Sequence, residues 1–224
     1  MLMTPRSVVW LLLAAFVGKV WSEDIGQVLE RSQNSRLASL PAIDALGKEA
    51  LPLHDAFERL QQSVPAAANA QLRVVSAGAV AETLDSRVIV MNVSLGELPE
   101  ICRLFLIAHE LGHVVQGHWA QRIALYRRFI PGEVVQAQTD AVADELGAEA
   151  SMQSRQQEYE ADAYAMRILL DMGYSRDELL EMFFHLGRHG ASATHPSTGQ
   201  RLAQLRQIYQ ERRLAAVPPP LAPR

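Results

Sequence analysis

The stretch from Pro99 to Val115 constrains the fold most. Its apolar residues recur every three or four positions, which predicts a long amphipathic helix with Pro99 and Glu100 in its first turn. His109 and His113 lie beside the apolar stripe, four residues apart. On a helix, two such imidazoles project from one face and can bind the same zinc ion. The fold then has to bring a further ligand from elsewhere in the chain to this helix.

Glu110 directly follows the first histidine and is the candidate general base for a water molecule at such a metal. A His-Glu-x-x-His sequence also arises by chance. A second acidic cluster argues against chance, because residues 158–162 begin 45 positions beyond His113 in another predicted helix. Since a catalytic zinc takes three protein ligands, we expect Glu158 to be the third.

Other polar residues near these motifs receive different predictions. Asp162 follows Glu158 by one helical turn and is expected to accept the outer N–H of a ligating histidine. Glu160 points about 200° away from Glu158 and is expected to be solvated. If the first helix continued, His118 would lie about 140° around it from His113, which predicts a surface or packing role.

Two further groups are not predicted to bind metal. His185 and His189 are four residues apart, but Gly187 lies between them and no third ligand is evident. Cys102 is the single cysteine, so no disulfide can form within the chain, and we expect it to be a small buried residue.

The rest of the chain predicts an α+β domain that is mostly α. Residues 23–64 indicate one or two amphipathic helices, in which Pro41 opens the second and Pro52 kinks or divides it. Val- and Ile-rich runs at 72–76 and 87–93 predict a hairpin or small meander. Helices are then expected from 133 to about 152, from 155 to 172, from 175 to about 187 or 190, and from 197 to 213.

The two ends differ from this domain. Residues 1–22 combine a basic start with a short apolar run, which predicts a secretory signal peptide; an uncleaved anchor or a buried amphipathic helix are the alternatives. Residues 23–214 form the expected domain, and the Pro-rich residues 215–224 are expected to be disordered. The formal net charge of −4, without a basic stripe, argues against nucleic-acid binding.

Three motifs in one order resemble the zinc metallopeptidase family that includes HtpX, the CaaX prenyl proteases and BepA: His109-Glu110-Leu111-Gly112-His113, then 154–162, then Thr194-His195-Pro196-Ser197 with Arg201. The resemblance implies a minimal zincin-like metallopeptidase domain, with a small β-sheet packed on the zinc-binding helix and one Zn²⁺ per chain. It implies that Glu158 is the third ligand and that Asp162 lies behind a histidine. It also implies that His195 approaches the metal, to stabilise the oxyanion or to occupy the open position; a loop histidine that caps the last helix is the rival.

The expected function is that of a periplasmic zinc endopeptidase for unfolded or misassembled exported proteins. An extended substrate would add as a strand to a sheet edge, for which we expect residues 87–93. Under this resemblance the partners also include the outer membrane or its assembly machinery, whereas the oligomeric state is left open. A periplasmic chaperone with a structural zinc site, or a hydrolase of another amide, are the alternatives. The spanning helices and the repeat domain of some relatives have no counterpart in the sequence.

Overall fold

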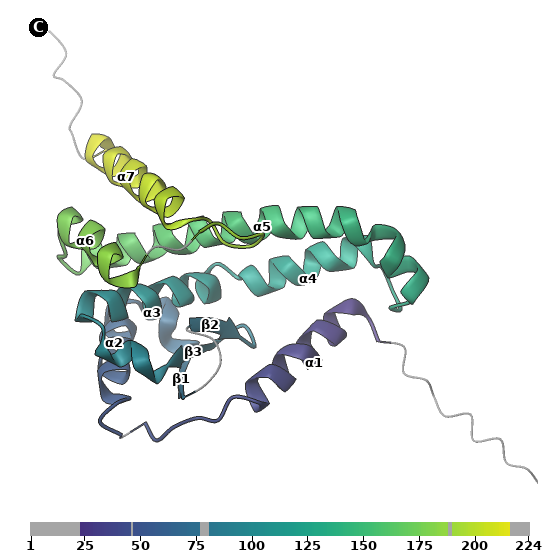
Figure 1. Ribbon diagram of the computed structural model, residues 1–224, viewed down its shortest axis with the longest axis horizontal. Helices are drawn as coiled ribbons and strands as arrows, with labels where there is room; N and C mark the ends of the chain where they lie inside the picture. Colours follow the sequence, from purple (N-terminus) through teal and green to yellow (C-terminus); the bar gives the residue numbers. More distant parts are fainter. Residues whose placement is uncertain (1–22, 46, 77–80, 188–189, 216–224) are drawn as a thin grey trace, which may run out of the picture.

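The computed structural model describes residues 23–45, 47–76, 81–187 and 190–215, with side chains as far as residue 210. It confirms an α+β fold that is mostly helical, with one small sheet (Figure 1). The predicted signal peptide and the tail from residue 216 lie outside the described residues. Within those ranges no helix combines the length and the apolar character needed to cross a bilayer.

The sheet consists of β1 (Gln71–Val75), β2 (Ala81–Leu84) and β3 (Val88–Asn92), in the order β1-β3-β2. β2 and β3 form an antiparallel hairpin, whose turn places Asp85 and Ser86 at φ values of 49° and 59°, as a tight hairpin turn requires. β1 and β3 run parallel, so the predicted strands exist but do not form a hairpin with each other. The expectation that residues 87–93 offer a free edge is wrong, because β3 is hydrogen-bonded on both sides.

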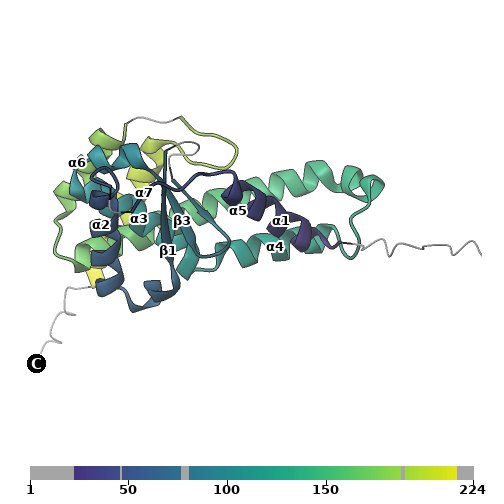
Figure 2. The ribbon, with the colours of Figure 1, turned by 90° about the horizontal axis from the view of Figure 1, so that it is seen from below.

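The main core lies between the sheet and the helices around α3 (Glu100–Val115), which is the predicted amphipathic helix. α2 (Leu51–Ser63), α6 (Arg176–Leu186) and α7 (Thr198–Ala215) belong to this side of the molecule, with the short 3-10 helices η1 (Pro65–Asn69) and η2 (Val93–Glu97) (Figure 2). Cys102 is fully buried here, as predicted. The largest side chains of this core come from several elements and include Leu53, Leu60, Ile89, Met91, Leu104, Phe105, Leu111, Met166, Leu169 and Met182.

A second group of helices extends to the opposite side of the sheet (Figures 1 and 2). It contains α1 (Ile25–Ala38), α4 (His118–Phe129) and the first half of α5 (Gln136–Asp171). These helices pack on a small core of their own, made of Ile25, Leu125, Ile130 and Leu146. The second half of α5 packs against α3, so one helix of 36 residues connects both cores.

Several helix boundaries differ from the predictions. The region expected to form two helices on either side of residues 152–155 is the single helix α5, since neither Gly nor Pro interrupts it there. Pro41 opens no helix, and Pro52 lies in the first turn of α2, where its missing N–H is not needed, so it does not kink the helix. His185 is exposed, and His189 lies outside the described residues.

Candidate metal centre

Three side chains from two helices converge on one point. His109 and His113 project from α3 and Glu158 projects from α5, and one ligand atom of each lies within 4.8 Å of the others. The Nε2 atoms of the two histidines are 3.3 Å apart, and each is 3.5 Å from a carboxylate oxygen of Glu158. Two imidazole nitrogens and one carboxylate oxygen form the donor set of a catalytic zinc site. The residues predicted as ligands are therefore brought together, and they fit zinc.

The outer nitrogen of His109 is held by Asp162, the residue predicted for this position. His109 Nδ1 lies 2.9 Å from Asp162 Oδ1, and Asp162 is fully buried. Arg201 of α7 donates from Nε to Asp162 Oδ2 at 2.7 Å and from Nη2 to Oδ1 at 2.5 Å. Burial opposes ionisation of Asp162, but the hydrogen bonds from Arg201 and His109 lower its pKa to about 2. The ionised carboxylate accepts the His109 proton and leaves Nε2 free to bind a metal.

The electrostatics favour a positive charge where the three ligands meet. Burial opposes protonation of His109, but the carboxylates of Asp162 and Glu158 raise its pKa to about 10. Burial opposes ionisation of Glu158, but the hydrogen bond from His109 and the charges of both histidines lower its pKa to about 2. Burial and the neighbouring His109 charge lower the pKa of His113 to about 3. A divalent cation would occupy this position by displacing the proton.

The outer nitrogen of His113 has a partner that the sequence analysis missed. His118 is buried, and its Nδ1 lies 2.8 Å from His113 Nδ1. Its Nε2 lies 3.2 Å from Glu160 Oε2, so Glu160 is not the purely solvated residue that we expected. α3 ends at Val115, and Gly117 adopts a left-handed φ of 66° before α4 begins at His118. This break turns His118 back toward His113, whereas the prediction assumed one continuous helix.

Glu110 lies beside the ligands and is held by the edge strand of the sheet. Its side chain is nearly buried, and Thr83 Oγ1 of β2 lies 2.7 Å from its Oε2 and 3.1 Å from its backbone oxygen. Burial raises the pKa of the Glu110 carboxyl, which makes it a stronger base. Thr83 was not predicted, because a strand of four residues leaves little signal in the sequence.

His195 approaches the site from the loop between α6 and α7. Its Nε2 lies 3.7 Å from Glu158 Oε1, and its side chain is 64% exposed. It does not belong to the cluster of three ligands. The rival prediction, that His195 caps the last helix, does not hold, because the Oγ of Ser197 accepts the backbone N–H of Gln200 at 3.3 Å.

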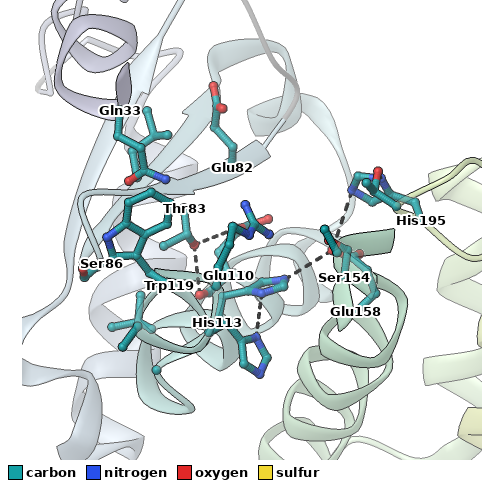
Figure 3. Close-up of a pocket in the computed structure, with 18 of the residues that line it drawn as sticks. Gln33, Glu82, Thr83, Ser86, Glu110, His113, Trp119, Ser154, Glu158 and His195 are labelled. Atoms are coloured by element: carbon teal, nitrogen blue, oxygen red, sulfur yellow. Dashed lines mark hydrogen bonds and ion pairs between the residues drawn. The ribbon is translucent and has the colours of Figure 1, made fainter. Parts of the chain in front are cut away.

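A pocket of about 580 Å³ opens over these residues. In Figure 3, Glu110 and His113 lie between Thr83 of β2 on one side and Glu158 on the other. Trp119 of α4 contributes to the wall of the pocket. Small residues of α5 line it further along that helix: Gly147, Ala150, Ser151 and Ser154.

A mostly helical fold with a small sheet, a His-Glu-x-x-His helix and a distant glutamate defines a metal-dependent peptidase. Residues 68–209 match peptidase family M48, and since the match covers more than half of the chain, the protein belongs to this family. The resemblance drawn from the three sequence motifs is thereby confirmed, and membership implies metal-dependent proteolysis. Searches among curated proteins and among solved structures gave no match.

Proposed function

We propose that the protein is a zinc-dependent endopeptidase that cuts unfolded or misassembled exported proteins. The observation that carries the proposal is the convergence of His109, His113 and Glu158 beside the buried carboxylate of Glu110. In this proposal the first three residues hold one zinc ion, and Asp162 fixes the orientation of His109. When bound, zinc would supply a Lewis acid that polarises the scissile carbonyl and lowers the pKa of a bound water molecule to about 7.

Glu110 is the proposed general base. Thr83 fixes its Oε2, and the hydrogen bonds found in the described part of the chain leave Oε1 available. Oε1 therefore takes the proton from the attacking water and passes it to the leaving amine. His195 is the proposed oxyanion partner, because it lies next to Glu158 without joining the ligand cluster.

The substrate is proposed to bind in an extended conformation along β2. Among the described residues this strand pairs with β3 alone, and its residues Glu82, Thr83 and Leu84 line the pocket that contains Glu110. A strand added at such an edge is bound mainly through its backbone, so affinity depends little on its side chains. Unfolded segments of many sequences meet this requirement, whereas folded proteins seldom expose a free strand.

The cellular setting is proposed from the sequence alone. Residues 1–22 have the pattern of a secretory signal, so we place the enzyme in the periplasm, either cleaved or tethered by this segment. Association with the outer membrane or its assembly machinery is proposed only on the family resemblance.

Replacing Glu110 by Gln tests the proposal, because the amide can still accept from Thr83 but cannot take a proton. Purified wild-type protein should contain one zinc per chain and digest casein, and a chelator should stop the digestion until zinc is restored. Glu110→Gln should keep its zinc and lose about 100-fold or more of the activity. Glu145, exposed on α5 and outside the pocket, provides the matched control Glu145→Gln, which should behave as wild type.

Two results would contradict the proposal. If purified wild-type protein contained no stoichiometric zinc, the proposed metal centre would be wrong. Zinc-loaded protein that prevents aggregation of unfolded substrates equally well with Glu110 or Gln at position 110, and cuts none of them, would instead identify a chaperone.

A further inference from the structure

The two histidine ligands are supported in different ways. The outer nitrogen of His109 meets a carboxylate directly, whereas that of His113 meets a second imidazole. That imidazole, His118, is buried, and its far nitrogen reaches Glu160. Gln156, one turn earlier on α5, donates to the other oxygen of Glu160 at 2.8 Å. These contacts thus form a series of hydrogen bonds that links α3 through α4 to α5.

The hydrogen bonds of this series can be satisfied in only one way when His113 binds a metal through Nε2. The metal requires a lone pair on His113 Nε2, so its proton is on Nδ1 and has to be donated. The atom 2.8 Å away is Nδ1 of His118, which can accept only if the His118 proton is on Nε2. That Nε2–H then points to Glu160 Oε2, an acceptor that carries no proton when ionised.

We propose that His118 and Glu160 are positioning residues that hold His113 in the tautomer and orientation needed to bind zinc. The inference rests on the proposed zinc site and assigns to it two residues beyond the ligands and Asp162. Neither residue is assigned contact with the substrate. Gly117 is part of the arrangement, since its left-handed conformation separates α4 from α3 and returns residue 118 to the ligand.

If the role of His118 were purely structural, substitutions at this position would have different effects. His118 also contributes to the contact between α4 and α5, because its backbone oxygen accepts from Gln157 Nε2 at 3.3 Å. If its side chain only filled space, substitutions would lower the stability of the zinc-free protein and leave zinc affinity and tautomer unchanged. The measurements therefore have to report on the metal and on the proton separately.

Three variants separate these roles. His118→Phe fills the site without an acceptor and should weaken zinc binding about 10- to 100-fold, the usual effect of losing the partner of a ligating histidine. His118→Asn can present its Oδ1 where Nδ1 now accepts, and should recover most of that loss. Glu160→Ala changes a residue whose side chain is 38% exposed, which leaves the core intact, and should weaken binding about tenfold. Glu145→Ala on the same helix is the control.

Zinc dissociation constants are measured by competition with a chelator at fixed pH, alongside thermal unfolding of the zinc-free proteins. Histidine-selective ¹⁵N NMR of the zinc-loaded wild type should show the His118 proton on Nε2. A proton on Nδ1 of His118, or wild-type zinc affinity in both His118→Phe and Glu160→Ala, would overturn the inference. Should His118→Phe fail to fold, Glu160→Ala and the NMR measurement still decide it.

These outcomes are distinguishable from failure of the proposed function. A wild-type protein that binds zinc with the expected tautomer but cuts no peptide contradicts only the peptidase activity. A wild-type peptidase whose zinc affinity is insensitive to positions 118 and 160 contradicts only the positioning role.

Discussion

Gly112 lies where the two helices that supply the ligands approach each other closely, and replacing it by alanine should weaken zinc binding. A Cβ atom at this position would lie 3.0 Å from the Cα of Ala161 and 3.3 Å from its Cβ and backbone oxygen. Gly112 precedes His113 directly, and Ala161 follows Glu158 by three residues on α5. The contact thus sets the distance between the histidine pair and the carboxylate.

The expected size of the effect follows from contact distances. Carbon atoms prefer separations of about 3.5–4.0 Å, so the added methyl group pushes α3 and α5 apart by about 0.5 Å. Zinc sites tolerate changes of only about 0.2 Å in ligand distances, so metal binding has to restore the close contact. Overpacking of this kind costs about 1–3 kcal/mol, which corresponds to a zinc affinity reduced by about 5- to 140-fold. Alanine also raises helix propensity by about 1 kcal/mol, so the zinc-free variant should lose little stability.

Gly147→Ala is the matched control, because Gly147 also lies within a helix and a Cβ added there meets no atom of the described residues within 4 Å. Zinc affinity is measured by chelator competition, and the stability of the zinc-free proteins by urea unfolding. Gly147→Ala should gain stability and bind zinc as wild type does. If Gly112→Ala also bound zinc as tightly as wild type, the close approach of the helices would not control the metal centre.

Two further predictions concern the loop and a helix terminus. His195→Ala should lower kcat without changing the zinc dissociation constant, since His195 lies beside Glu158 but outside the ligand cluster; a gain in activity would show instead that this histidine blocks the metal. Ser175→Ala should lower the free energy of unfolding in urea by about 1 kcal/mol, because the Ser175 side chain caps α6. Hydrogen bonds from Ser175 lower the pKa of Glu178. The difference in unfolding free energy between variant and wild type should therefore shrink as the pH falls below 4.5 and Glu178 is protonated. A difference that stays constant down to pH 3 would contradict this capping box.

The ligands could be predicted because they obey local rules. The four-residue spacing of His109 and His113 fixes their common face on any helix, and Glu158 and Asp162 follow the same rule. Their meeting across two helices follows from no local rule, so that prediction rested on the family resemblance and on the number of ligands that zinc requires.

Features that depend on where an element stops were harder to predict. His118 was misplaced because helical periodicity was extended through Gly117, although a glycine just after a helix is a common end signal. The four residues of β2 carry no clear alternation, so neither the edge strand nor Thr83 was identified. As a consequence, the free edge was assigned to β3, which tertiary pairing places in the centre of the sheet.

Glu160 shows why one helical face does not describe α5. Residues 158 and 160 point in directions about 200° apart, and a helix with one packed neighbour would expose one of them. α5 contacts both α3 and α4, so Glu158 meets the ligands of α3 while Glu160 meets His118 at the start of α4. Arg155 of the same helix donates to two backbone oxygens of the loop that carries His195. A single helix therefore orients a ligand, the support of a second ligand and the approaching loop, which preorganises the centre before any metal binds.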